Sequence, residues 1–199
     1  MHPQYSFVCG YILYWIFYIE SVKKGGEQYT LDEKIKNLLN EQINKEFESA
    51  YLYLGFANFF ERLGLSGYAH YYEVQAREEI DHGLLIYKYL HHNNEKVKLM
   101  VVKTNTKEFK EIKDVLEYGV QAEESITRSI NKIYELAIKT GDYRTMEFLS
   151  WFVKEQLEEE ENAKKMISDY DLFTNNNSLF NLDNTYKKRD FVKANMEII

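Results

Sequence analysis

The sequence predicts an all-α protein, an antiparallel four-helix bundle with one long crossover and a short fifth helix near its C-terminal end. Three observations support this fold class. Apolar residues recur at helical spacing over four long segments. The only proline is Pro3, so no helix-breaking ring occurs from residue 4 onward. The breaks between the segments are short, long and short in turn, which is the connectivity of a bundle with one crossover.

The first helix is predicted at about residues 31–62, where Asp32 can cap or charge its first turn. The chain then breaks at residues 64–67, Gly-Leu-Ser-Gly, a loop so short that the next helix must be an antiparallel neighbour. The second helix is predicted at about residues 68–91. Residues 91–106 lack a helical period and are far longer than a tight turn, so we expect them to form the long crossover.

The third helix is predicted at about residues 106–140. Gly141 and the aspartate after it then supply a C-cap followed by an N-cap. The fourth helix is predicted at about residues 142–170. Three asparagines at 175–177 break the chain before a weaker amphipathic stretch at about 183–196, which is the expected short fifth helix.

Residues 1–30 form an atypical apolar extension that does not match the rest of the chain, so the bundle domain is predicted to cover residues 31–199. Residues 5–19, YSFVCGYILYWIFYI, lack a basic region before them and a small-residue cleavage site after them. They also fall short of the roughly 20 residues that span a bilayer as a helix. Two interpretations stay open, a short membrane anchor and a start-site artefact. The second rests on residues 23–27, Lys-Lys-Gly-Gly-Glu, because a purine-rich ribosome-binding sequence gives such residues when it is translated.

The amino-acid composition limits the classes of partner that the bundle domain is expected to bind. A formal net charge of −7 argues against nucleic acid and against an anionic membrane surface, and it is compatible with a metal cation. The single cysteine, Cys9, excludes an intrachain disulfide and any four-cysteine metal site, and it favours a reducing cytoplasm. The 17 tyrosines and 12 phenylalanines predict an aromatic interior.

Each of the four long helices has one glutamate near the middle of its apolar stripe. These residues are Glu46, Glu79, Glu123 and Glu159. One such glutamate is more often a surface residue than a ligand, but four at similar depth in neighbouring helices are hard to attribute to chance. Burying an unpaired carboxylate costs several kcal/mol. Two divalent cations would balance the four negative charges.

The ligand types favour iron at this position. His82 lies one turn after Glu79, and carboxylates with one imidazole suit Fe(II), Mn(II) or Zn(II), whereas the lack of thiolates disfavours a structural zinc site. We expect Glu79 to bridge two ions, with Glu46 and His82 on one ion and Glu123 on the other. Tyr53 lies two turns after Glu46 on the same face, where it either packs in the core or takes part in redox chemistry.

Four motifs include these residues: LNEQINKEFESAYLYL (39–54), AREEIDH (76–82), AEESIT (122–127) and WFVKEQLEEEE (151–161). Together they resemble the motifs of non-haem bacterial ferritins, members of the ferritin-like di-iron carboxylate family. The resemblance covers about residues 31–195. It implies a ferritin-like antiparallel four-helix bundle with a short C-terminal helix.

The resemblance also implies three groups of iron ligands. The first iron would be held by Glu46, Glu79 and His82. The second would be held by Glu123, Gln156 and Glu159. A possible third iron would be held, beside Glu159, by Glu78, Glu155 and Glu158.

Two departures separate the chain from neighbouring families. Its fourth helix offers Gln156-x-x-Glu159 where bacterioferritin and rubrerythrin have a second Glu-x-x-His pair. Ile80 stands where bacterioferritin has its haem-binding methionine, so no haem is expected. Because the chain has a single cysteine, it also lacks the cysteine-rich domain of rubrerythrin.

The function implied by the resemblance is iron storage and detoxification in the cytoplasm. A ferroxidase centre would oxidise Fe(II) with O2 or H2O2, and the Fe(III) mineral would be kept inside a homo-oligomeric cage of twenty-four subunits. Four aromatic residues are expected on helix exteriors and are compatible with partner subunits: Tyr51, Phe59, Tyr87 and Tyr143. Two alternatives stay open, a di-iron redox enzyme of the peroxidase or oxygenase type on the same bundle, and a metal-free helical interaction protein.

Overall fold

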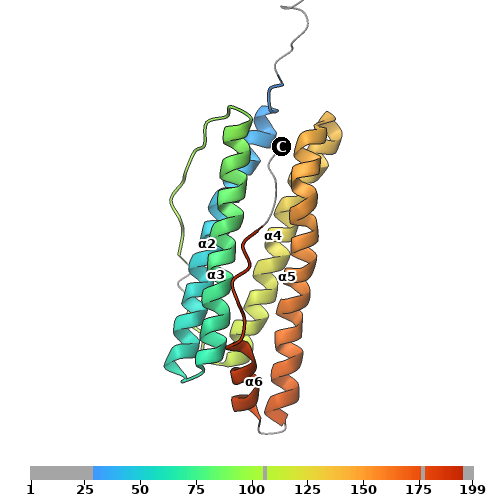
Figure 1. Ribbon diagram of the computed structural model, residues 1–199. Helices are drawn as coiled ribbons and strands as arrows, with labels where there is room; N and C mark the ends of the chain where they lie inside the picture. The colour runs from blue at the N-terminus through green and yellow to red at the C-terminus, as the bar shows by residue number, and fades with distance from the viewer. Residues whose placement is uncertain (1–28, 105–106, 176–177, 195–199) are drawn as a thin grey trace, which may run out of the picture. The chain divides into compact units, whose positions relative to one another are not determined.

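The computed structural model describes residues 29–104, 107–175 and 178–194 (Figure 1). These residues contain five helices and no strand. The helices are α2 (Glu33–Arg62), α3 (Ser66–His92), α4 (Ile112–Thr140), α5 (Tyr143–Asn175) and α6 (Leu179–Tyr186). The apolar stretch at residues 5–19, with both interpretations of it, lies outside the described residues.

The four long helices form the predicted bundle. Helices α2 and α3 pack along each other, α4 packs along α5, and α2 also contacts α4 (Figure 1). The two pairs are joined by the long crossover between α3 and α4, of which residues 93–104 and 107–111 are described. The all-α class and the bundle topology are therefore confirmed. Among the described residues, none of the helices combines the length and the apolar character needed to cross a membrane.

Several helix ends agree with the expected capping chemistry. Asp32 accepts hydrogen bonds from the backbone N–H groups of Lys34 (2.8 Å) and Ile35 (3.3 Å) at the start of α2. Gly141 ends α4 in the left-handed region, with φ 69°. Asp142 then accepts the backbone N–H of Thr145 at 3.0 Å, as an N-cap for α5.

Helix α4 begins six residues later than the position near 106 that the sequence predicts. The described residues before it, 107–111, are not helical, and there the ring of Phe109 packs against Phe56 (5.5 Å between centroids) and Tyr118 (5.4 Å). A helix through residue 109 would have to give up this anchor. Helix α5 is longer than predicted, because it continues to Asn175, beyond the predicted end near residue 170.

The crossover is fixed along α2 by three polar side chains spaced one helical turn apart. The bonds join Lys98 N to Asn40 Oδ1 (2.6 Å), Asn44 Nδ2 to Val101 O (3.3 Å) and Lys103 N to Glu48 Oε1 (3.2 Å). The spacing of four residues places the three side chains in one row along the helix. A row of this kind satisfies backbone groups of an extended chain that has no strand to pair with.

The interior is aromatic, as the composition predicts. Phe60 stacks on Tyr68 (4.7 Å between ring centroids) and on Tyr72 (5.6 Å). Tyr72 also stacks on Tyr53 at 5.7 Å. This aromatic cluster occupies the α6 end of the bundle core and reaches the layer of buried glutamates through Tyr53.

The short fifth helix lies earlier in the chain than predicted. It covers Leu179–Tyr186, and residues 187–194 are not helical, whereas the sequence predicts a helix at 183–196. Its position is set by Asp183, whose Oδ1 accepts the backbone N–H groups of Gly67 (2.8 Å) and Tyr68 (3.0 Å). Helix α3 has no side-chain cap of its own, so Asp183 caps it from α6.

Candidate metal centre

The four stripe glutamates are all buried, as the helical pattern predicts. Their exposed fractions are 1% for Glu46, 3% for Glu79, 4% for Glu123 and 6% for Glu159. Each comes from a different long helix of the bundle. A set of buried carboxylates of this size needs compensating positive charge or bound protons.

Three of the predicted ligands form a compact group. Glu46, Glu79 and His82 each offer one ligand atom, and these atoms all lie within 4.8 Å of one another. Glu79 and His82 are one turn apart on α3, which places both on the same face, and Glu46 approaches from α2. The Nδ1 atom of His82 lies 3.6 Å from Glu79 Oε2. This buried Glu-Glu-His group could hold a metal ion.

The other predicted ligands lie around Glu123 on α4. The Tyr53 hydroxyl donates a hydrogen bond to Glu123 Oε1. Gln156 on α5 donates from Nε2 to Glu123 Oε2 at 3.3 Å. A cavity of about 20 Å³ is lined by Tyr53, Glu123, Glu159 and Gln75 among others. It has room for one water or one ion among these polar groups.

Two glutamines support the ligand glutamates from one turn earlier in each helix. Gln42 donates from Nε2 to Glu46 Oε1 at 2.9 Å, and Gln75 donates to Glu79 Oε1 at 3.1 Å. Within the described part of the chain, the Oε1 atoms of both glutamines and Glu46 Oε2 are buried without a hydrogen-bond partner. Unpaired buried acceptors are costly, and a cation or its bound water would satisfy them.

The electrostatics of the layer reflect its burial. Burial first, and then the charge of Glu79, raises the pKa of Glu46 and of Glu159 to about 8 in each case. The same two causes, with the charge of Glu159, raise the pKa of Glu123 well above its usual range. Burial would lower the pKa of His82, but the hydrogen bond and charge of Glu79 and the charge of Glu46 raise it to about 10. The metal-free layer therefore holds protons that a divalent cation would displace.

The three candidate ligands for a third iron, Glu78, Glu155 and Glu158, differ in their burial and in their contacts. Glu78 is buried and forms an ion pair with Arg189. Glu155 is half-buried, and its Oε1 lies 3.8 Å from Nε2 of His82. Glu158 is exposed on α5. Of the three, Glu155 approaches the buried Glu-Glu-His group directly, at His82.

Four residues to which the sequence pattern assigns no role lie near the centre: Gln42, Gln75, Thr127 and Arg189. The two glutamines had a usable signal, because each precedes a stripe glutamate by four residues. Thr127 accepts from Gln156 Nε2 at 3.3 Å and donates to Glu160 Oε1 at 2.7 Å, so it connects the side chains of Gln156 and Glu160 on α5. No local sequence pattern predicts the role of Arg189, because its partner Glu78 is 111 residues away.

The sequence of the bundle is similar to those of known proteins. The family model of the ferritin-like domain matches residues 36–173. The chain is 36% identical over 130 residues to the bacterial non-heme ferritin of Staphylococcus saprophyticus and 39% identical over 130 residues to that of Campylobacter jejuni. Each alignment covers 65% of this chain and 78% of the relative.

Solved structures are similar over an even larger share of the chain. An engineered closed form of the Archaeoglobus fulgidus ferritin superposes with a TM-score of 0.79 at 32% identity, covering 82% of this chain and all of that one. The open-pore ferritin of the same archaeon gives a TM-score of 0.78 at 32% identity, covering 80% of this chain and 98% of that one.

Proposed function

This chain belongs to the ferritin family, and from that premise we propose that it oxidises Fe(II) at a centre inside each subunit and stores the product as ferric mineral. The observation that supports this most strongly is the buried Glu46-Glu79-His82 group. It lies in the same bundle layer as two further buried glutamates, Glu123 and Glu159. Metal-free helix packing would gain nothing from four carboxylates at this depth.

The first Fe(II) would be held by Glu46 and His82, and Glu79 would bridge it to the second. Glu123 and Glu159 would hold the second ion, with Gln156 beside it. Four carboxylates supply a charge of −4, which two Fe(II) ions balance. Oxygen-rich ligands stabilise Fe(III) relative to Fe(II), so this ligand set lowers the cost of electron loss.

The reaction needs two electrons, and two bound ions supply one each. With dioxygen as oxidant, two electrons and two protons give hydrogen peroxide; with hydrogen peroxide, they give two waters. The protein contributes binding, orientation and proton release, because carboxyl protons leave as iron enters. Tyr53 positions Glu123 through its hydroxyl hydrogen bond, and this contact supports a role beyond core packing.

The cage of twenty-four subunits and the cytoplasmic location belong to the same proposal. Large exposed side chains such as Tyr51 (55% exposed) and Tyr143 (78% exposed) support burial against partner subunits. The single cysteine supports the reducing compartment. No haem is proposed, because the ligands of the centre are carboxylates and one histidine.

Removal of the bridging carboxylate tests this function. Metal-free wild-type protein mixed with Fe(II) in air should show a fast rise in ferric absorbance in a stopped-flow experiment. Glu79→Ala should lose this fast phase, whereas Glu161→Ala should keep it, since Glu161 is an exposed glutamate of the same charge on α5. An unchanged initial rate in Glu79→Ala, or no catalysed rise in the wild type, would overturn the proposal.

A further inference from the structure

The chain after α6 returns along the bundle. In Figure 1 the dark red segment that follows α6 passes between α3 and α5. Its contacts run in order from His70 to Asp81 on α3 and from Arg189 to Ala194 on the segment. Eleven helical steps of about 1.5 Å and five extended steps of about 3.3 Å both cover about 16 Å. The segment therefore follows α3 in register.

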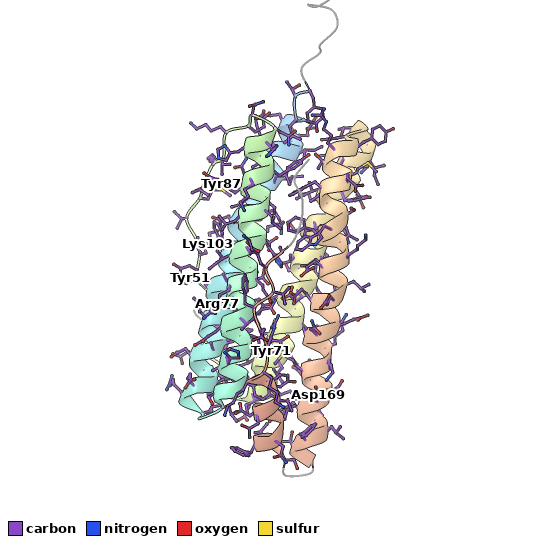
Figure 2. The ribbon with its side chains drawn as sticks, viewed as in Figure 1. Tyr51, Tyr71, Arg77, Tyr87, Lys103 and Asp169 are labelled. Atoms are coloured by element: carbon purple, nitrogen blue, oxygen red, sulfur yellow. The ribbon has the colours of Figure 1, made fainter. Side chains whose placement is uncertain are left out.

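Arg189 anchors the segment to α3 through both its backbone and its side chain. Its carbonyl oxygen lies 2.8 Å from His70 Nε2, and its Nη1 donates to the carbonyl of Tyr71 at 3.4 Å. The guanidinium carbon lies 4.0 Å from the centre of the Tyr71 ring, which Figure 2 labels on α3. A cation over an aromatic face with two backbone contacts is a well-defined position for an arginine.

The segment uses both carboxylate oxygens of Glu78. Oε2 pairs with the Arg189 guanidinium, and Oε1 accepts the backbone N–H of Val192 at 3.4 Å. One turn further along α3, Asp81 Oδ2 accepts the backbone N–H of Ala194 at 2.8 Å. Glu78 and Asp81 are both buried, so these bonds replace water at the two carboxylates.

The ion pair with Glu78 brings the Arg189 guanidinium near enough to the candidate metal centre for its charge to act on Glu159. Glu78 directly precedes the proposed bridging residue Glu79 in the sequence. Glu155 approaches the Glu46-Glu79-His82 group at His82. The charge of Arg189 also lowers the pKa of Glu159, although burial raises it overall. A divalent cation at Glu78 would therefore face a fixed positive charge and two occupied oxygens.

We propose that residues 189–194 are a built-in occupant of the third iron position, with the Arg189 guanidinium taking the place of a cation at Glu78. This inference rests on the proposed function of the two-metal centre. Each subunit then binds two ions while the segment is in place, and a third position opens beside Glu78 only when Arg189 is lost. Arg189 is thus a residue that determines stoichiometry rather than a catalytic residue.

Zn(II), which undergoes no redox reaction, is a suitable probe. Isothermal titration calorimetry of the full-length metal-free protein should give two tight sites per subunit in the wild type and three in Arg189→Gln. Arg189→Lys should stay at two, because it keeps the charge. Arg189→Gln combined with Glu78→Gln should return to two. The matched control is Arg77→Gln, an exposed arginine on α3 labelled in Figure 2, which should bind two.

The possible failures are distinct. Two sites in both the wild type and Arg189→Gln would overturn this inference and leave the proposed function intact. A third tight site in the wild type that disappears in Glu78→Gln would overturn it as well. No tight site in the wild type would overturn the proposed function and this inference together.

Discussion

At the scale of single residues, the ligand glutamates depend on neighbours that hold their carboxylates in place. Gln75 donates to Glu79 Oε1 and leaves its own buried Oε1 without a hydrogen-bond partner in the described structure. Partners of this kind orient metal ligands, and losing one commonly costs about 10- to 100-fold in metal affinity. Gln75 is therefore a positioning residue for the proposed bridge.

Gln75→Ala should weaken binding of Zn(II) about tenfold or more, because Glu79 loses the donor that fixes its rotamer. A competition titration against a chromophoric chelator measures this affinity. Gln121→Ala is the control, since Gln121 is exposed on α4. Equal affinities in the two variants would show that Gln75 does not position the bridge.

The stability of the metal-free protein should fall as the pH rises. Burial raises the pKa of Glu46 and Glu159 to about 8, above the ordinary value of 4.5, so the folded state holds protons that the unfolded state releases. Their contribution is complete below about pH 4.5 and is lost as the pH rises through about 8. His82, with its pKa raised to about 10, acts in the same direction.

Thermal unfolding of the metal-free protein at pH 6, 7 and 8.5 measures this effect. Each extra bound proton changes the free energy of unfolding by about 1.4 kcal/mol per pH unit. Glu46→Gln should give a flatter dependence, and Zn(II) should restore stability at the higher pH. An unfolding temperature that rises over this range would contradict the assigned pKa shifts.

At the scale of helices, α6 and α3 are joined by a contact that leaves no room for a side chain. A Cβ atom at Gly67 would lie 1.7 Å from the carbonyl oxygen of Asp183. Gly67→Ala should therefore displace α6 and destabilise the fold by about 1–3 kcal/mol. Denaturant unfolding measures the cost, and hydrogen exchange in α6 shows whether that helix has moved.

Gly55→Ala is the matched control for this substitution. Gly55 lies in the middle of α2 along its length and is exposed to solvent. Nothing lies within 4 Å of a Cβ added there. Alanine should stabilise that position by about 0.5–1 kcal/mol because it restricts the unfolded chain. If the two variants had the same stability, the close contact between Gly67 and α6 would be wrong.

The helices show which parts of the fold the sequence could predict. The four long helices and the Asp32, Gly141 and Asp142 caps follow from spacing and local chemistry, and the structure confirms them. The inward direction of the four glutamates also follows from periodicity. Their role as iron ligands stays a prediction.

The parts that the sequence missed depend on contacts between distant residues. Phe109 delays the start of α4 by packing on Phe56, and Asp183 places α6 by capping α3. In the non-helical residues 187–194, the backbone N–H groups of Val192 and Ala194 bond to Glu78 and Asp81 on α3. No local pattern in the sequence encodes these pairings, since each partner is far away along the chain.

At the scale of the whole molecule, the exposed surface predicts an assembly. Large apolar side chains remain exposed on the long helices, among them Tyr51, Leu54, Ile80, Tyr143 and Leu157. Tyr51 and Lys103, both labelled in Figure 2, lie on the side of the bundle where the crossover passes α2. Surfaces with this much apolar character usually meet a partner.

Gel filtration of the purified protein should give a single large species, as expected for a cage of twenty-four subunits. A di-iron redox enzyme on the same bundle would elute near the size of a dimer. A dimer that still oxidises Fe(II) rapidly would favour that alternative over iron storage.

We propose that four buried glutamates and one histidine form a two-iron centre inside each subunit. Anomalous X-ray scattering at the iron edge, from crystals soaked in Fe(II), tests it most directly because it locates and counts the ions. We expect two peaks per subunit, one between Glu46, Glu79 and His82 and one between Glu79, Glu123 and Glu159. Iron peaks elsewhere in the subunit with none among these residues would contradict it.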